Sequence, residues 1–160
     1  MEKILVGMNP VSASFWAGLH ALNLAKRIDA RVCFLHVVDP GLSQDPDPPP
    51  DQDASNDATK RMDHFVERAR AEGIPVDCYV SEGDYESELV RFIQEKGITM
   101  LVLGEPEGRV MAPARFAAFL DRIRHRVDCR IEVLHEKTFT QDKKRKENAN
   151  VAHISTHRRQ

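Results

Sequence analysis

Two short apolar segments, each containing or followed by a glycine and leading into a polar turn, are the residues best placed to bind a ligand. Ile4–Met8 passes through Gly7 into Asn9–Ser12, and Met100–Leu103 is followed directly by Gly104. Such runs predict buried parallel strands, and two strand ends at a topological switch point of an open α/β sheet form a crevice for a nucleotide. The turn after Gly104 has only half of the glycines that a phosphate-binding loop would have. The sequence therefore predicts a crevice and leaves its occupant open.

The histidines and cysteines do not form a pattern that binds a metal or supports nucleophilic catalysis. No metal spacing such as HExxH relates His20, His36, His64 and His125. Cys33 and His36 are three positions apart on one predicted strand, so their side chains should face opposite sides of the sheet. The cysteines form no CxxC pair and are expected to be reduced core residues: Cys33, Cys78 and Cys129. We therefore predict neither catalytic nor metal-binding residues.

The spacing of apolar residues predicts five strands that alternate with four helices. The strands are expected at Lys3–Met8, Arg31–Val38, Pro75–Ser81, Thr99–Leu103 and Arg130–His135. The helices are expected from Ser12 or Ser14 to Ile28, at Ala58–Glu72, between a cap at Asp84 and Gly97, and from Pro113 onward. Crossovers of this length join parallel strands with right-handed connections. The predicted fold class is α/β, a doubly wound three-layer α/β/α sandwich with a parallel sheet at its centre.

The chain is expected to form one domain over residues 1–135, with an acidic loop inside it and a basic tail after it. Residues 41–57 contain four prolines, five aspartates and no basic residue, which predicts a flexible loop. Its aspartates lack the spacing of a calcium-binding EF-hand. Residues 136–160 carry seven Lys or Arg against three Asp or Glu, whereas the rest of the chain carries 16 against 22. An acidic body with a basic tail argues against a nucleic-acid-binding protein.

The sequence also bears on where the protein acts. No segment approaches the roughly 18 apolar residues that a membrane span requires. The first residues, Met1–Ile4, lead directly into a strand and show no signal-peptide pattern. We therefore expect no membrane association and a cytoplasmic location.

An ordered series of short motifs resembles the universal stress protein family. The matching segments are Lys3–Val6, Leu35–Asp39, Gly83–Asp84 before a helix, and Gly97–Gly104. The resemblance covers residues 1–135 and implies a five-stranded parallel sheet of order 3-2-1-4-5, the adenine nucleotide alpha hydrolase-like fold. It also implies a homodimer formed through the fifth strand, Arg130–His135, and a role in stress survival by binding rather than by turnover.

One branch of that family binds ATP through a glycine motif that this chain matches only in part. The motif has a glycine after the fourth strand, a second three residues on, and Gly-Ser or Gly-Thr ten residues later, because side chains there would block the approach of phosphates to backbone N–H groups. The first position is Gly104, the second falls on Glu107 with Gly108 one place late, and the last pair falls on Ala117–Ala118. A carboxylate 4 Å from a phosphate costs about 4 kcal/mol at an effective dielectric near 20.

The remaining crevice positions are better preserved. Asn9 stands where the family has an aspartate that faces the ribose, and it can still form hydrogen bonds. Val37 matches the position whose backbone meets adenine, and Arg109 and Arg115 could offset the charge of Glu107. The predicted crevice is Gly7, Asn9, Val37, Leu103, Gly104, Gly108 and Arg109. Alternatively, Gly7 and Gly104 serve turns and packing, and side chains such as Met8 and Met111 fill the crevice.

The sequence leaves three functions open. The first is a binding or regulatory protein of the stress response that does not bind ATP tightly and needs no cofactor. The second is a universal stress protein that holds ATP or AMP in the loops after the first and fourth strands. The third is a nucleotide hydrolase-like enzyme, against which the absence of an SGGxDS-like phosphate loop argues.

Overall fold

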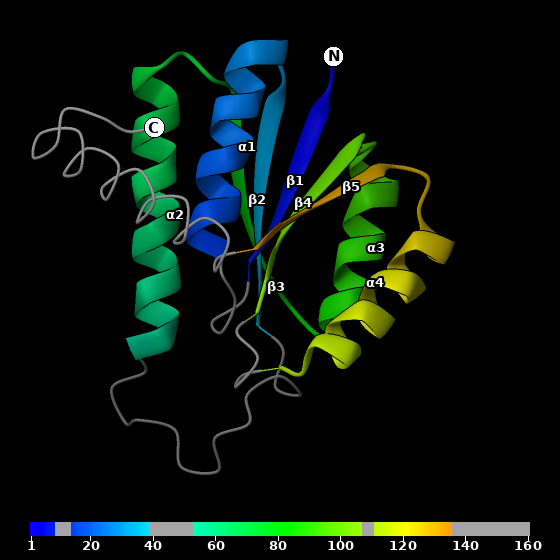
Figure 1. The fold of residues 1–160 in the computed structure, drawn as a ribbon. Coiled ribbons are helices and arrows are strands. Elements are labelled where there is room, and N and C mark those ends of the chain that lie inside the picture. Colours follow the sequence, from blue (N-terminus) through cyan, green and yellow to red (C-terminus); the bar gives the residue numbers. More distant parts are fainter. Residues whose placement is uncertain (9–13, 39–52, 107–110, 136–160) are drawn as a thin grey trace, which may run out of the picture.

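The fold is a five-stranded parallel sheet between two pairs of helices (Figure 1). The computed structural model describes residues 1–8, 14–38, 53–106 and 111–135. Its elements are β1 (Lys3–Met8), α1 (Ser14–Ile28), β2 (Arg31–Val38), α2 (Asp53–Ala71), β3 (Val76–Glu82), α3 (Tyr85–Lys96), β4 (Met100–Glu105), α4 (Pro113–Arg126) and β5 (Arg130–His135). The strand order is β3-β2-β1-β4-β5 with every pair parallel, which confirms the predicted fold class and order.

Two apolar cores lie on the two faces of the sheet. Alternate residues of each strand point to opposite faces. In β2, Val32 and Phe34 therefore pack with α1 and α2, whereas Cys33, Leu35 and Val37 pack with α3 and α4. Figure 1 shows the same division, with α1 and α2 on one side of the strands and α3 and α4 on the other. Burial on both faces explains why these strands are continuous apolar runs rather than alternating ones.

Some element boundaries differ from the predicted ones. The bounds of β1, β2 and β5 are as predicted, but β4 extends to Glu105, so that Gly104 lies within the strand and not in the turn after it. The helix α2 begins at Asp53, before the expected start at Ala58, so the last residues of the predicted loop 41–57 are helical. Residues 41–52 of that loop and the predicted tail 136–160 lie outside the described residues.

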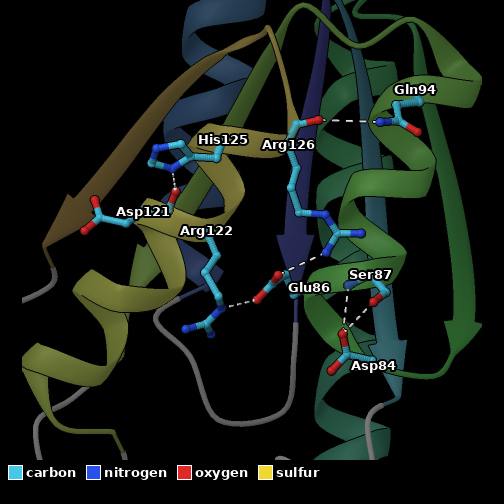
Figure 2. Close-up of polar contacts among 8 residues, drawn as sticks. All are labelled: Asp84, Glu86, Ser87, Gln94, Asp121, Arg122, His125 and Arg126. Carbon is cyan, nitrogen blue, oxygen red and sulfur yellow. Dashed lines mark hydrogen bonds and ion pairs between the residues drawn. The ribbon is translucent and has the colours of Figure 1, made fainter.

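Helix α3 is closed at both ends by the residues that the sequence indicates. The Asp84 carboxylate accepts hydrogen bonds from the backbone N–H of Ser87 at 2.9 Å and from its hydroxyl at 2.8 Å (Figure 2). At the other end Gly97 adopts a left-handed conformation, φ 65°, and its N–H bonds the carbonyl of Ile93. Glycine reaches this conformation without a steric penalty, so the sharp turn into β4 follows.

Polar contacts join α3 to α4 on the outside of the second core. The Glu86 carboxylate accepts from Arg122 Nε at 2.7 Å and from Arg126 Nη1 at 3.0 Å (Figure 2). Gln94 Nε2 donates to the carbonyl of Arg126 at 3.5 Å. These contacts hold the C-terminal half of α4 against α3.

Candidate functional site

The predicted crevice lies where the carboxyl ends of β1 and β4 meet. The strands are direct neighbours, with Leu5 beside Leu101 and Val6 beside Val102. The chain leaves β1 toward β2 on one side of the sheet centre and leaves β4 toward β5 on the other, so this is the topological switch point. Gly104 lies at this edge, where it pairs with Leu134 of β5. The placement of both strand ends at one edge agrees with the sequence interpretation.

Gly7 has a packing role on the α3 side of this edge. A Cβ atom there would lie 2.7 Å from the Tyr85 hydroxyl, 2.9 Å from Leu89 Cδ2 and 3.0 Å from Leu103 Cδ2. Such distances are shorter than van der Waals contact, so α3 can approach the sheet this closely only because Gly7 lacks a side chain. Close packing therefore accounts for Gly7, and its contact with a ligand stays a prediction.

Aromatic rings extend this packing from α3 to α4. The Tyr85 ring stacks on Phe119 with centroids 5.7 Å apart, and Phe119 stacks on Phe116 at 5.9 Å. All three rings are buried and belong to the core on the α3 and α4 face. A buried layer of stacked aromatic rings thus lies between α3, α4 and the sheet on this side.

The apolar crevice residues can offer a ligand only their backbone. Val37 and Leu103 are buried, and their side chains belong to the core under α3 and α4. Met8 belongs to the opposite core, under α1 and α2, whereas Met111 packs against the core under α3 and α4. The two methionines therefore lie on opposite faces of the sheet and do not jointly fill one crevice.

Part of the predicted glycine motif can be placed and part cannot. Asn9, Glu107, Gly108 and Arg109 lie outside the described residues. Ala117 and Ala118 are exposed on α4; the resemblance predicts glycine and a hydroxyl at these positions in the ATP-binding branch. Methyl groups there offer a phosphate no hydrogen bond.

The amino-terminal end of α4 remains suited to an anion. The cap residue Ala112 makes no side-chain hydrogen bond to it, Pro113 opens it, and its first turn has no acidic residue. Arg115 is exposed in that turn. Pro113 has no N–H, and the N–H groups of Arg115 and Phe116 donate to the Ala112 carbonyl, so it is the helix dipole that favours negative charge at this end.

The thiols of the core under α3 and α4, Cys33 and Cys129, are not activated as nucleophiles. The prediction that Cys78 is also a core residue is wrong, because it lies exposed on the edge strand β3. Burial raises the pKa of the Cys33 thiol, and Asp77 raises it further. Burial likewise raises the pKa of Cys129. Thiols shifted this way are protonated at neutral pH, and a protonated thiol is a poor nucleophile. Among the described residues, no group of three His, Cys, Asp or Glu could hold a metal ion.

One residue at this edge has a feature that the sequence did not reveal. His36 is paired with Met8 of β1, and it lies on the opposite face from Cys33, as predicted. Its side chain is buried, and within the described part of the chain neither ring nitrogen has a hydrogen-bond partner. The only available signal was its position inside an apolar strand, which predicts burial but not the lack of a partner.

Comparison with known families then identifies the fold. A model described as the universal stress protein family matches residues 1–135. The chain belongs to the universal stress protein family. No curated protein matches the sequence. None of the described helices has the length and apolar character of a membrane-spanning segment.

Solved universal stress proteins share the architecture at low sequence identity. UspA from Lactobacillus plantarum has a TM-score of 0.59 and 22% identity, over 83% of this chain and 97% of that one. An Arabidopsis thaliana family protein with AMP bound has a TM-score of 0.58 and 16% identity, over 84% and 92%. A universal stress protein from Archaeoglobus fulgidus in complex with dAMP has a TM-score of 0.56 and 14% identity, over 83% and 97%. At such identities the likeness shows the fold alone.

Proposed function

We propose that this protein is a binding or regulatory universal stress protein that acts in the stress response without tight ATP binding. The observation that carries the proposal is the pair Ala117–Ala118, exposed on α4 where the ATP-binding branch has its phosphate contacts. Glu107 in place of the second glycine adds a negative charge to the same loop. A cost of about 4 kcal/mol for like charges at 4 Å corresponds to about three decades in affinity.

A second candidate is a protein that binds AMP or ATP in the same crevice. The uncapped start of α4 and the exposed Arg115 favour it, since both suit an anionic group. Structural neighbours of the same fold were solved with AMP and dAMP. AMP carries fewer charges than ATP, so Glu107 would repel it less. The crevice residues proposed for this contact are Gly7, Asn9, Val37, Leu103, Gly104, Gly108 and Arg109.

Thermal unfolding with and without nucleotide distinguishes the two candidates. A ligand at 100 times its dissociation constant stabilises the folded state by about 2.7 kcal/mol, which raises the Tm by several degrees. We expect no shift with millimolar Mg·ATP. A clear shift with ATP would overturn the first proposal, and a shift with AMP alone would establish the second candidate.

A gain-of-binding variant tests the reason for the loss. We expect the double substitution Glu107→Gly and Ala118→Ser to create ATP binding, because it removes the repelling carboxylate and restores a hydroxyl. The matched control is Glu95→Gly with Ala71→Ser, which changes the same residue types at exposed positions of α3 and α2, away from the motif. If neither double variant binds ATP, the motif does not explain the loss.

We further propose that the protein is not an enzyme, works in the cytoplasm and forms a homodimer through β5. The protonated thiols of Cys33 and Cys129 support the first point, because they offer no ready nucleophile. The position of β5 at the edge of the sheet supports the last, because an edge strand can pair with a second copy. ATP turnover at an enzyme-like rate by the purified protein would instead support the hydrolase-like alternative.

A further inference from the structure

We propose that His36 makes the carboxyl ends of β2 and β3 sensitive to acid, because protonation of its buried ring opens this end of the sheet. This acid sensitivity depends on the packing of His36 alone, so it is expected whether or not a nucleotide binds.

The geometry of the ring is the first support. The residue is 4% exposed, and it is the one buried polar or charged side chain among the described residues. Neither Nδ1 nor Nε2 has a hydrogen-bond partner within that part of the chain. A neutral imidazole carries one N–H donor and one acceptor, whereas the protonated ring carries two donors and a charge. Protonation therefore destabilises the buried ring further, because it adds a second N–H donor without a partner and a buried positive charge.

Within the described residues, the surroundings of the ring give that charge no hydrogen-bond acceptor. Met8 of β1 and Val80 of β3 lie beside His36 in the sheet, and the core on this face is apolar. The titratable or charged groups on the elements packed against this face include His20 of α1, Arg61, Asp63 and His64 of α2, and Cys78 and Glu82 of β3. Asp63 lies close enough to Cys78 to raise the pKa of that thiol. None bonds to the ring, and burial alone lowers the pKa of His36.

The position of His36 makes opening local rather than global. It lies close to the end of β2, and the neighbouring Val38 and Val80 are already 37% and 68% exposed. Exposing the ring to water therefore requires separation of only the last residues of β2 from β3. Separation of one strand end is a local opening, which costs less free energy than global unfolding. Val37, the proposed backbone contact for adenine, would move with them.

The direction of the pH effect follows from linkage. His36 has a lowered pKa in the closed state, against 6.5 for the exposed ring, so the open state binds the proton more tightly. Closure is favoured fully above pH 6.5, and it is weakened as the pH falls from there toward the lower pKa. For one proton, the opening equilibrium rises by up to about tenfold per pH unit in that interval.

Hydrogen exchange on the full chain without nucleotide tests the proposal. Protection of the β2 and β3 amides is measured between pH 7.5 and 5 and corrected for intrinsic exchange, in wild type, His36→Leu and His125→Gln. His125 is exposed on α4 and is the control. We expect protection to fall by up to about tenfold per pH unit in wild type and His125→Gln, and to stay level in His36→Leu. Equal acid sensitivity in all three proteins, or none in wild type, would overturn the proposal.

A second measurement covers the case in which His36→Leu does not fold. The titration of the wild-type His36 ring is followed by NMR through its carbon-bound ring protons. The proposal requires the ring to titrate below the ordinary histidine pKa of 6.5, together with loss of β2 and β3 signals. A ring that titrates at or above that value with those signals unchanged would contradict it.

Discussion

Gly18 lies in the interior of α1, where glycine is a poor helix former. A Cβ atom at this position would meet the Phe65 ring at 2.4 Å, and that ring is stacked on Phe34 with centroids 5.0 Å apart. Helix propensity alone predicts that Gly18→Ala stabilises the protein by about 0.5–1 kcal/mol. Contact with a ring held in a packed core predicts the opposite, a loss of about 1–3 kcal/mol.

We expect the packing effect to decide the sign, so that Gly18→Ala lowers the free energy of unfolding measured with denaturant. The control is the same substitution in a Phe65→Ala background, where space for the methyl group exists. In that background Gly18→Ala should be neutral or stabilising. A stabilising effect in the wild-type background would show that α1 lies farther from α2 than described.

At Asp84 the expected effect is that of a helix cap. Hydrogen bonds from Ser87 lower the pKa of this carboxyl from its ordinary 3.8. We expect Asp84→Ala to cost about 1 kcal/mol at neutral pH, measured by denaturant unfolding. The contribution is fully present above pH 3.8 and is lost as the pH falls through the lower folded-state pKa, so the gap between wild type and variant should narrow in acid. Asp128→Ala, at an exposed position, should show no such gap.

For single residues, the sequence predicts helix caps and buried positions better than it predicts contacts between residues that are distant in the chain. Asp84 and Gly97 were predictable because cap residues act on their own helix, within a few positions. The isolation of the His36 ring and the closeness of Tyr85 to Gly7 were not predictable, because both depend on which strands and helices meet. The crevice residues Asn9, Glu107, Gly108 and Arg109 remain predictions.

At the scale of the elements, the Glu86 carboxylate is the side chain of α3 that forms ion pairs with α4. The Glu86 side chain is 16% exposed and contacts Arg122 and Arg126, which are 56% and 44% exposed. We expect Glu86→Gln to lower the free energy of unfolding by about 1 kcal/mol, because two partly shielded contacts weaken together. The control is Glu95→Gln: Glu95 is 54% exposed and contacts Arg91, so its loss should cost less than about 0.5 kcal/mol. An equal loss of unfolding free energy in the two variants would show that the contacts of Glu86 with α4 add no more stability than an exposed ion pair within one helix.

The bounds of a strand were predictable where an apolar run ends at polar residues. The bounds of β1, β2 and β5 follow from apolar runs limited by polar residues. The prediction for β4 stopped too early because glycine usually marks a turn, whereas Gly104 and Glu105 continue the strand by pairing with Leu134 and His135 of β5. Glu105 also contacts the His135 ring, which adds a side-chain contact at this end. The local spacing of apolar residues cannot predict pairing with a strand that lies about 30 residues later in the chain.

For the whole molecule, we expect only one of the two edge strands, β5 and not β3, to form the dimer interface. If β5 forms the dimer, sedimentation should give twice the chain mass of 18.2 kDa. We expect Leu134→Lys to yield monomers, because Leu134 is half-buried on β5 and lies outside both cores. Val80→Lys places the same charge on β3, the opposite edge, and should leave the dimer intact. The reverse pattern would assign the interface to β3.

The strand order of the whole sheet came from the family resemblance, whereas the layered class came from the alternation of strands and helices. Alternation cannot order the strands, because a crossover may place the next strand on either side. The glycine-containing ends of the two apolar runs predicted a crevice there, and the resemblance supplied the strand order that makes β1 and β4 neighbours.

The division of the interior into two cores also affects how this molecule can evolve. Leu5 and Val6 are neighbours in the chain, yet they belong to compartments separated by the sheet. Residues without shared partners usually mutate with additive effects. Substitutions in the core behind Gly7 can therefore accumulate while the core beneath α1 keeps its composition.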